Sequence, residues 1–240
     1  MTQRLVFLHG FTQTHHHWHA CARRIADRIP DSVTLAFVDL PGHGLSGDDR
    51  RPLDDAAVEV ARTGGRGTYV AYSMGGRFAL AALAARAPEI ERLVVIGATG
   101  GLDDAADRAA RVEEDERRAQ RVEQIGVDAF VDEWLAMPMF GGVPFAARDR
   151  AHRCRNTAAG LASSLRLAGT GAQRPVWDAL RGVTIPVLVM AGDRDAKFTE
   201  IGHRLAATIP GATFAAIPGA GHAAHAEQPD ATADLITSWL

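Results

Sequence analysis

The 240-residue chain is 47% hydrophobic and carries a formal net charge of −3. It is long enough to bury one sizeable core, but two full domains are not expected. Because it has no long run of like charge, nothing favours a nucleic acid or a membrane surface as a partner, and no apolar run approaches the length that spans a bilayer.

Cys21 and Cys154 are isolated thiols without CxxC spacing. They are therefore expected to be reduced and to bind no metal. The first apolar run, at 5–8, is too short for the apolar region of a signal peptide and is not followed by a cleavage site. These features predict a cytoplasmic protein, and they are compatible with either a monomer or a small homo-oligomer.

Strand-like and helical segments alternate along much of the chain. Strands are expected at 4–8, 33–40, 68–72, 93–96, 186–190 and 212–217, and helices at 18–29, 53–61, 75–86 and 201–208. A continuous apolar run such as 33–40 is typical of a strand buried on both faces of a sheet. The alternation predicts an α/β fold with a mostly parallel, doubly wound sheet.

The alternation stops between about residues 100 and 182, where helices and loops are expected. The segment 103–124 has opposite charges at i,i+3 and i,i+4 spacing, which predicts a helix with a solvated face. We expect one domain over 1–240, with a core at 1–99 and 183–240 and a substrate-selecting helical cap at about 100–182. The second half of this cap contains seven arginines. Together they suit an anionic substrate, although each of them taken singly is at least as compatible with a surface patch. They are Arg148, Arg150, Arg153, Arg155, Arg166, Arg174 and Arg181.

The stretch T-Y-V-A-Y-S-M-G-G-R at 68–77 passes from a strand through a small-residue turn into an alanine-rich helix. This is the form of a strand–elbow–helix unit that presents a serine, here Ser73, on a strained turn. The usual elbow reads G-x-S-x-G, and Ala71 replaces its first glycine. Taken alone, Ser73 is equally compatible with a simple helix N-cap.

Two later residues match the remaining members of a catalytic triad. Asp195 lies in a G-x-x-D turn after a strand, which favours it over Asp193, and His222 lies on a glycine-flanked loop after the last strand. The order Ser73, Asp195, His222 is that of the α/β-hydrolase fold. His222 would activate Ser73, and Asp195 would fix the imidazole tautomer.

Phe11 and Met74 are the expected oxyanion-hole residues, because their backbone N–H groups follow the His-Gly loop and the serine respectively. His9 is expected to be structural, and the loop D-L-P-G-H-G-L-S at 39–46 to act as a scaffold. His225 is an alternative to His222 as the catalytic base, but a role in helix capping or packing is favoured for it.

Histidines at positions 15, 16, 17 and 19 surround Trp18. Adjacent histidines in a loop point in different directions, and no i,i+4 pair with an acidic third ligand accompanies them as in H-E-x-x-H. The sequence therefore predicts no metal site in this run.

Arg77 lies one helical turn after Ser73 and so on roughly the same face. A cation in the first turn of a helix opposes the macrodipole by roughly 0.3–1 kcal/mol. A nearby carboxylate would compensate for it. The favoured alternative is a carboxylate of the substrate, since a guanidinium group binds a carboxylate bidentately.

Five motifs together resemble the menaquinone-pathway 2-succinyl-6-hydroxy-2,4-cyclohexadiene-1-carboxylate (SHCHC) synthases. They are L-H-G-F at 8–11, D-L-P-G-H-G-L-S at 39–46, Y-S-M-G-G-R at 72–77, L-R-L-A-G-T-G-A-Q at 165–173 and G-D-R-D-A-K-F at 192–198. The first two occur in many α/β-hydrolases, whereas the other three are more specific. The resemblance extends over nearly the whole chain.

The resemblance implies a lyase without a cofactor, in which the triad removes a proton from a cyclohexene polycarboxylate and pyruvate is eliminated. Ser73 would then act as a base. The implied substrate-binding residues are Tyr72, Arg77, Arg111, Trp134 and Lys197. A carboxylesterase or carbon–carbon hydrolase of the same fold, and a catalytically silent binding protein, are the alternatives.

Overall fold

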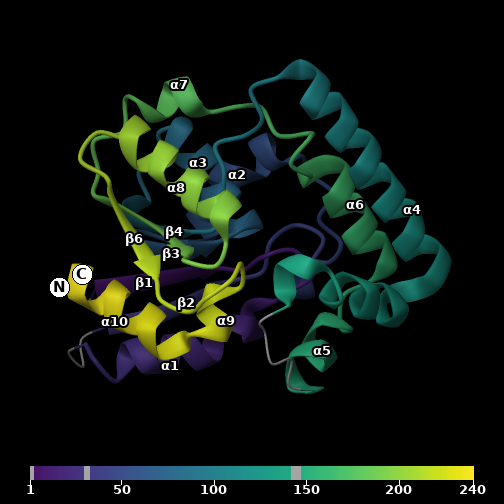
Figure 1. The fold of residues 1–240 in the computed structure, drawn as a ribbon, viewed down its shortest axis with the longest axis horizontal. Helices are drawn as coiled ribbons and strands as arrows, with labels where there is room; N and C mark the ends of the chain where they lie inside the picture. Colours follow the sequence, from purple (N-terminus) through teal and green to yellow (C-terminus); the bar gives the residue numbers. More distant parts are fainter. Residues whose placement is uncertain (1–2, 30–32, 142–146) are drawn as a thin grey trace.

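The computed structural model describes residues 3–29, 33–141 and 147–240, with the side chains of 147–149 left out. Its centre is one sheet of six strands, all parallel, in the order β2-β1-β3-β4-β5-β6 (Figure 1). The strands are β1 (Gln3–Leu8), β2 (Val33–Val38), β3 (Gly67–Tyr72), β4 (Ile90–Ile96), β5 (Val187–Gly192) and β6 (Thr213–Ile217). The parallel sheet predicted from the alternating pattern is confirmed.

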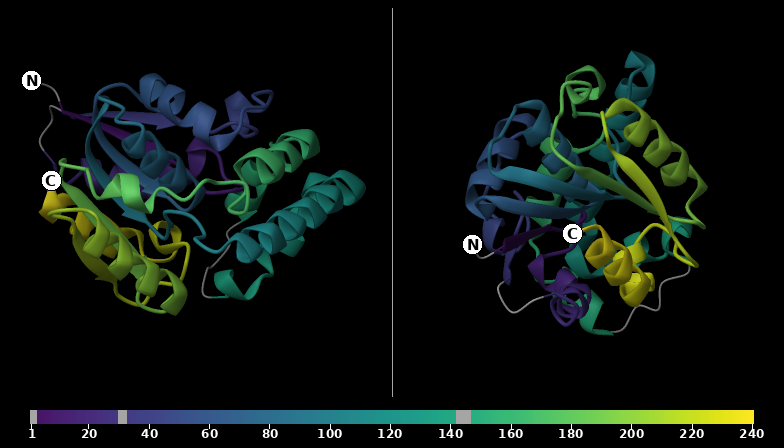
Figure 2. Two further views of the ribbon diagram at one scale, coloured as in Figure 1. Left: turned by 90° about the horizontal axis from the view of Figure 1, so that it is seen from above. Right: turned by 90° about the vertical axis from the view of Figure 1, so that its left-hand side faces the viewer.

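Helices cover both faces of the sheet (Figures 1 and 2). They are α1 (His19–Ala26), α2 (Leu53–Gly64), α3 (Met74–Ala84), α4 (Ala105–Leu135), α5 (Ala147–Arg153), α6 (Ala158–Ala168), α7 (Trp177–Leu180), α8 (Ala196–Thr208), α9 (Ala224–Glu227) and α10 (Pro229–Trp239), with the 3-10 turns η1 (His15–Trp18), η2 (Gly44–Ser46) and η3 (Pro138–Phe140). None of the described helices combines the length and apolarity needed to cross a membrane.

Two buried clusters hold these layers together. On one face, α2, α3 and α8 pack through Ala57, Phe78 and Leu205. On the other, α1 and α10 pack through Ile25 and Ile236. Burial of side chains on both faces explains why the central strands are apolar along their whole length.

Some element boundaries differ from those predicted. The helix expected at 103–124 continues to Leu135, because Gly126 (φ 79°) kinks the chain without ending the helical run. Its second part buries Phe130 and Val131, and Phe130 packs with α6. Helix α8 begins at Ala196, before the predicted 201, since the Asp195 side chain accepts a hydrogen bond from the Phe198 N–H group.

Candidate active site

Ser73 occupies a strained turn between β3 and α3. Its φ of 51° and ψ of −110° lie outside the conformations that a non-glycine residue ordinarily adopts. The turn packs tightly against its surroundings, because a Cβ atom on Gly75 would lie 2.5 Å from the Leu8 carbonyl oxygen. Ala71, which replaces the usual first glycine, is fully buried in β3. The chain therefore forms the elbow despite that replacement.

Ser73, His222 and Asp195 come together at the carboxyl edge of the sheet. His222 Nε2 lies 3.3 Å from Ser73 Oγ, and His222 Nδ1 lies 2.8 Å from Asp195 Oδ2. With a proton on Nδ1 donated to Asp195, the lone pair of Nε2 faces the serine hydroxyl. The arrangement can therefore move a proton from Ser73 to His222.

The surroundings keep Asp195 ionised. Burial opposes its negative charge, but the hydrogen bond and charge of His222, the Phe198 N–H group and the charge of Lys197 together hold the pKa of Asp195 below its ordinary value. An anionic carboxylate at this position favours the imidazolium form of His222 when that ring accepts a proton.

Glu227 fixes the loop that carries His222. Its carboxylate accepts hydrogen bonds from the N–H groups of Gly221 (2.7 Å) and Ala223 (3.0 Å), one on each side of the histidine. This residue was not among the predicted site residues. Its only signal in the sequence was an acid in the short helix that follows the glycine-flanked loop.

His225 is buried in the core, away from solvent. Its ring lies 4.4 Å from that of Tyr72 and 4.5 Å from that of Trp18, between centroids, and its Nε2 lies 3.3 Å from the amide nitrogen of Gln13. Burial lowers its pKa to about 3. These contacts agree with the packing role expected for it.

The histidines of the first two βα loops hold those loops together. His9 Nε2 accepts a hydrogen bond from the Leu40 N–H group (3.0 Å), and His43 Nε2 accepts one from the Thr12 N–H group (3.2 Å). Both rings are fully buried. The structural role of His9 and the scaffolding role of the 39–46 loop are therefore confirmed.

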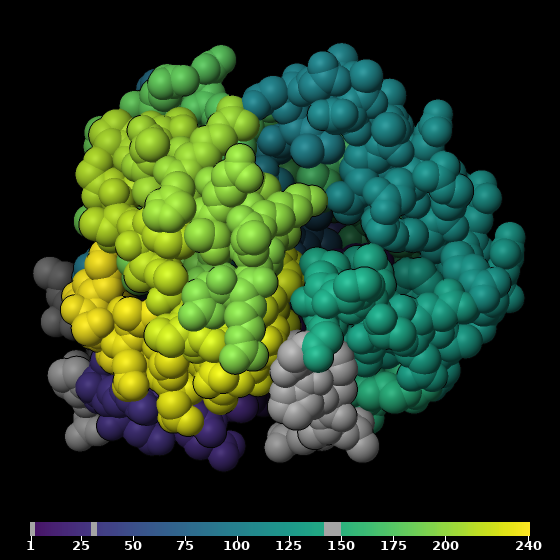
Figure 3. Space-filling model, in the orientation of Figure 1, coloured from purple at the N-terminus to yellow at the C-terminus, as the bar shows by residue number. Residues whose placement is uncertain are grey.

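A cavity of about 300 Å³ opens above Ser73. Figure 3 shows the molecular surface hollowed between the α4 side and the α8 side. The walls come from the loops after the carboxyl ends of the strands and from α3, α4, η3, α5, α6 and α8. Among the lining residues are Phe11, Tyr72, Ser73, Met74, Arg77, Arg111, Asp115, Arg118, Trp134, Phe140, Arg153, Lys197 and His222.

Comparison with known proteins agrees with this architecture. Residues 5–235 match the alpha/beta hydrolase family. SHCHC synthases of Klebsiella pneumoniae and Salmonella typhimurium are 33% and 31% identical to the chain, over 98% and 100% of it and over 93% and 94% of those proteins. The chain belongs to the SHCHC synthase family. A solved structure of MenH from S. aureus superposes with a TM-score of 0.90 at 29% identity, covering 100% of this chain and 94% of that one.

All five residues implied by the resemblance to SHCHC synthases line the cavity: Tyr72, Arg77, Arg111, Trp134 and Lys197. Phe11 and Met74, expected to form the oxyanion hole, line it as well. The fold thus brings all ten predicted site residues to one place, although they come from β3, α3, α4 and α8 and from the loops after β1, β5 and β6.

Arg77 is a buried cation in the wall of this cavity. It is 8% exposed, and its Nη1 donates a hydrogen bond to Gln173 Oε1 at 3.4 Å. Burial, together with repulsion by Arg111, lowers its pKa to about 10, while Asp115 acts in the opposite direction. Asp115 lies 2.9 Å from Arg111 instead, and within the described ranges no ion pair of Arg77 is recorded.

The seven arginines in the second half of the predicted cap are mostly on the surface. Arg150, Arg166, Arg174 and Arg181 pair with nearby carboxylates, and the Arg148 side chain lies outside the described residues. Arg153 is the exception among those described, because it is buried, lines the cavity and donates hydrogen bonds to Thr12 Oγ1 and to the Phe11 carbonyl. Most of the positive charge of these seven arginines therefore lies outside the cavity.

The loop predicted for the histidine run is wrong. Residues 15–18 form the 3-10 turn η1 and continue directly into α1, so they are not part of an irregular loop. The side chains of His15, His16 and His19 consequently lie together, with one ring nitrogen from each within 4.8 Å of the others.

Proposed function

We propose that this chain eliminates pyruvate from 2-succinyl-5-enolpyruvyl-6-hydroxy-3-cyclohexene-1-carboxylate to give SHCHC, a step of menaquinone biosynthesis. One observation carries the proposal: a buried arginine, Arg77, opens into the same cavity as Ser73 and His222. A neutral ester needs no such cation, whereas a substrate carboxylate compensates for its charge. The names of the relatives support the same reaction.

In the proposed mechanism Ser73 is a base. Ser73 Oγ gives its proton to His222 Nε2 and removes a proton from the substrate ring. The electron pair of that C–H bond moves into the ring, the bond from the ring to the enolpyruvyl oxygen breaks, and pyruvate leaves in its enol form. The two protons restore the serine hydroxyl and neutralise the leaving oxygen.

The other site residues have proposed roles around this step. Arg77, Arg111 and Lys197 bind the carboxylates, and the N–H groups of Phe11 and Met74 stabilise negative charge as it develops. In the described part of the chain, no acceptor lies within hydrogen-bond distance of Trp134 Nε1. This indole N–H group is therefore proposed to donate to the substrate, and Tyr72, which lines the same cavity, is proposed to pack against the substrate.

The direct test is pyruvate release from the enolpyruvyl precursor, measured by a coupled assay with the wild-type chain and Ser73→Ala. The wild type should release one pyruvate per precursor, and the variant should lose at least about 10²-fold in rate, as expected when a positioned base is removed. Normal turnover by Ser73→Ala, in a protein that unfolds at the wild-type temperature, would contradict the proposal.

A carboxylesterase or carbon–carbon hydrolase is the second candidate, because the strained serine bonded to His222 is also the arrangement of an acylating nucleophile. Rapid cleavage of neutral nitrophenyl esters that is unaffected by Arg77→Ala would favour it. If such ester cleavage is observed and no pyruvate is released from the precursor, the chain is a hydrolase and the lyase proposal is wrong.

The domain division is also proposed: one domain over 1–240, with a core at 1–99 and 183–240 and a helical cap at about 100–182. An apolar cluster between α4 and α6, including Val122, Phe130 and Leu161, supports a cap with its own small core. Cytoplasmic action is proposed as well, and both cysteines being free thiols is compatible with that compartment.

A further inference from the structure

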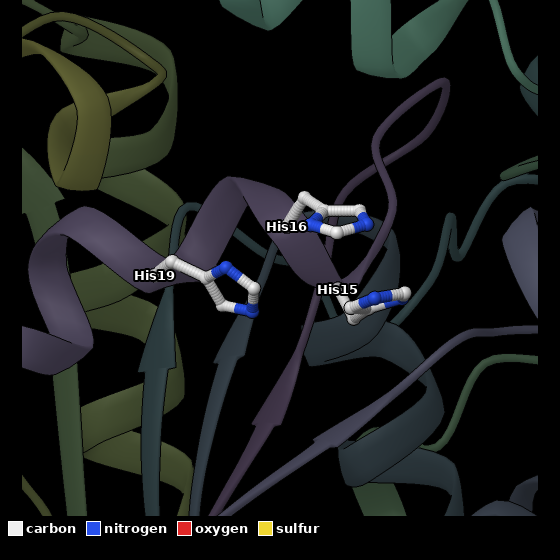
Figure 4. A group of neighbouring side chains, drawn as sticks. All are labelled: His15, His16 and His19. Carbon is white, nitrogen blue, oxygen red and sulfur yellow. The ribbon is translucent and has the colours of Figure 1, made fainter.

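His15, His16 and His19 form a compact cluster where η1 joins α1. Their spacing explains it: in a continuous helical turn, residues i and i+4 and residues i+1 and i+4 are neighbours on one face. The ring centroids of His15 and His16 lie 4.0 Å apart, and those of His16 and His19 lie 5.0 Å apart. Figure 4 shows the ring of His19 turned toward the other two.

We infer that these three histidines bind one divalent transition-metal ion of the zinc class. One nitrogen from each ring already lies within 4.8 Å of the others. Ligands at 2.0–2.1 Å from a tetrahedral ion lie about 3.4 Å apart. Small side-chain rotations of half-exposed rings are enough to close that gap.

A neighbouring carboxylate orients the first ligand. His15 Nδ1 lies 2.7 Å from Asp39 Oδ2, which is also fixed by the Leu45 N–H group at 2.9 Å. With the Nδ1 proton donated to Asp39, the lone pair of Nε2 is available for a metal. Metal-binding histidines commonly have this carboxylate support, which fixes the tautomer and raises the basicity of the ligand.

The second ligand is held by a neighbouring helix. His152 of α5 stacks on His16 with 4.3 Å between centroids, which supports the ring on its other side.

The donor set selects the kind of ion. Three imidazoles favour zinc, copper or nickel, whereas magnesium and calcium prefer oxygen ligands. Three protein ligands on a tetrahedral ion also leave one position for water or another group. All three histidines lie outside the described set that lines the substrate cavity, so the site is separate from Ser73.

The test is a calorimetric titration of the tag-free, chelator-treated chain with zinc chloride. We expect saturable binding of one ion per chain, which an excess of Mg²⁺ does not displace. His15→Ala, His16→Ala and His19→Ala should each weaken binding by at least about tenfold. His203→Ala is the matched control, because it removes an exposed histidine from α8 and should leave the affinity unchanged.

A second measurement guards against misfolded variants. Zinc should raise the unfolding temperature of the wild type, because an ion bound only by the folded state stabilises it. The three variants should keep the metal-free unfolding temperature of the wild type within a few degrees and lose the zinc-dependent rise. Absence of saturable binding, displacement by Mg²⁺, or equal affinity in the wild type and His19→Ala would overturn the inference.

Discussion

The Nδ1 atom of His222 lies 2.8 Å from Oδ2 of Asp195, and both side chains are largely buried, at 3% and 14% exposure. The two residues are 27 positions apart and are brought together by the loops that follow β5 and β6. This contact orients the ring whose other nitrogen faces Ser73. Its removal should therefore affect the chemical step more than substrate binding.

Asp195→Asn should lower kcat for pyruvate release by roughly 10²–10⁴-fold with little change in KM, because an amide stabilises neither the required tautomer nor the imidazolium. Asp193→Asn is the matched control. Its carboxylate accepts a hydrogen bond from the Gly219 N–H group at 2.9 Å and is exposed, so its kcat should stay near that of the wild type. Equal losses in the two variants would show that Asp195 has no special role.

Arg77→Met should make the protein more stable and less active. Methionine removes a buried charge that forms no ion pair in the described ranges. Replacing even a paired buried charge by apolar residues can add about 1–4 kcal/mol to the free energy of unfolding, and a similar gain is expected here. Loss of the proposed contact with a substrate carboxylate should reduce kcat/KM by roughly 10–100-fold.

Urea unfolding and steady-state pyruvate release measure the two effects of Arg77→Met. Arg174→Met provides the comparison, since it removes the same charge from a side chain that is 88% exposed and should change neither quantity appreciably. If Arg77→Met is less stable than the wild type, then groups of the protein itself already compensate for the buried charge of the Arg77 guanidinium without a substrate.

The free energy of unfolding should fall with acidification already at pH values above the ordinary pKa range of carboxylates. Burial lowers the pKa of both His43 and His225 to about 3, compared with about 6.5 in an unfolded chain. Their stabilising contribution is full above pH 6.5 and is lost as pH falls toward 3, because only the unfolded state binds the protons. The free energy of unfolding should therefore change by up to about 1.4 kcal/mol per pH unit for each of these histidines.

Urea unfolding at pH 7.5, 6 and 5 measures this slope, and His225→Gln should reduce it by about one histidine's share. His203→Gln, on the surface of α8, should leave the slope as it is in the wild type. An unchanged slope in His225→Gln would mean that His225 takes up its proton in the folded state.

Gly75→Ala should destabilise the elbow, because the added methyl group would lie 2.5 Å from the Leu8 carbonyl oxygen, where only backbone movement relieves the contact. Overpacking of this kind costs about 1–3 kcal/mol. Gly182→Ala places its methyl group 3.5 Å from the nearest atom and should be neutral or slightly stabilising. Thermal unfolding of the two variants compares them directly, and equal midpoints would contradict the crowding argument.

Much of this protein is determined by the sequence itself. The alternating pattern predicts the parallel sheet, and Ser73, Asp195 and His222 can be selected by their positions after strands, because parallel strands bring all such loops to one edge. The family resemblance names Arg111 and Trp134 within the cap. Local signals were sufficient to select the three triad residues, since each lies in a turn or loop that follows a predicted strand.

Other features depended on the tertiary structure. Gln173 bonds to Arg77, which is 96 residues away in the chain, and Glu227 bonds to the backbone on both sides of His222, so no spacing rule predicts these contacts. Only packing shows that Arg153 faces the cavity while Arg150 and Arg166 pair on the surface. The prediction for the histidine run was wrong because the rings of His15, His16 and His19 lie together only when residues 15–19 form a helical turn. The apolar contacts that stabilise this turn come from elsewhere in the fold, so the local sequence does not indicate it.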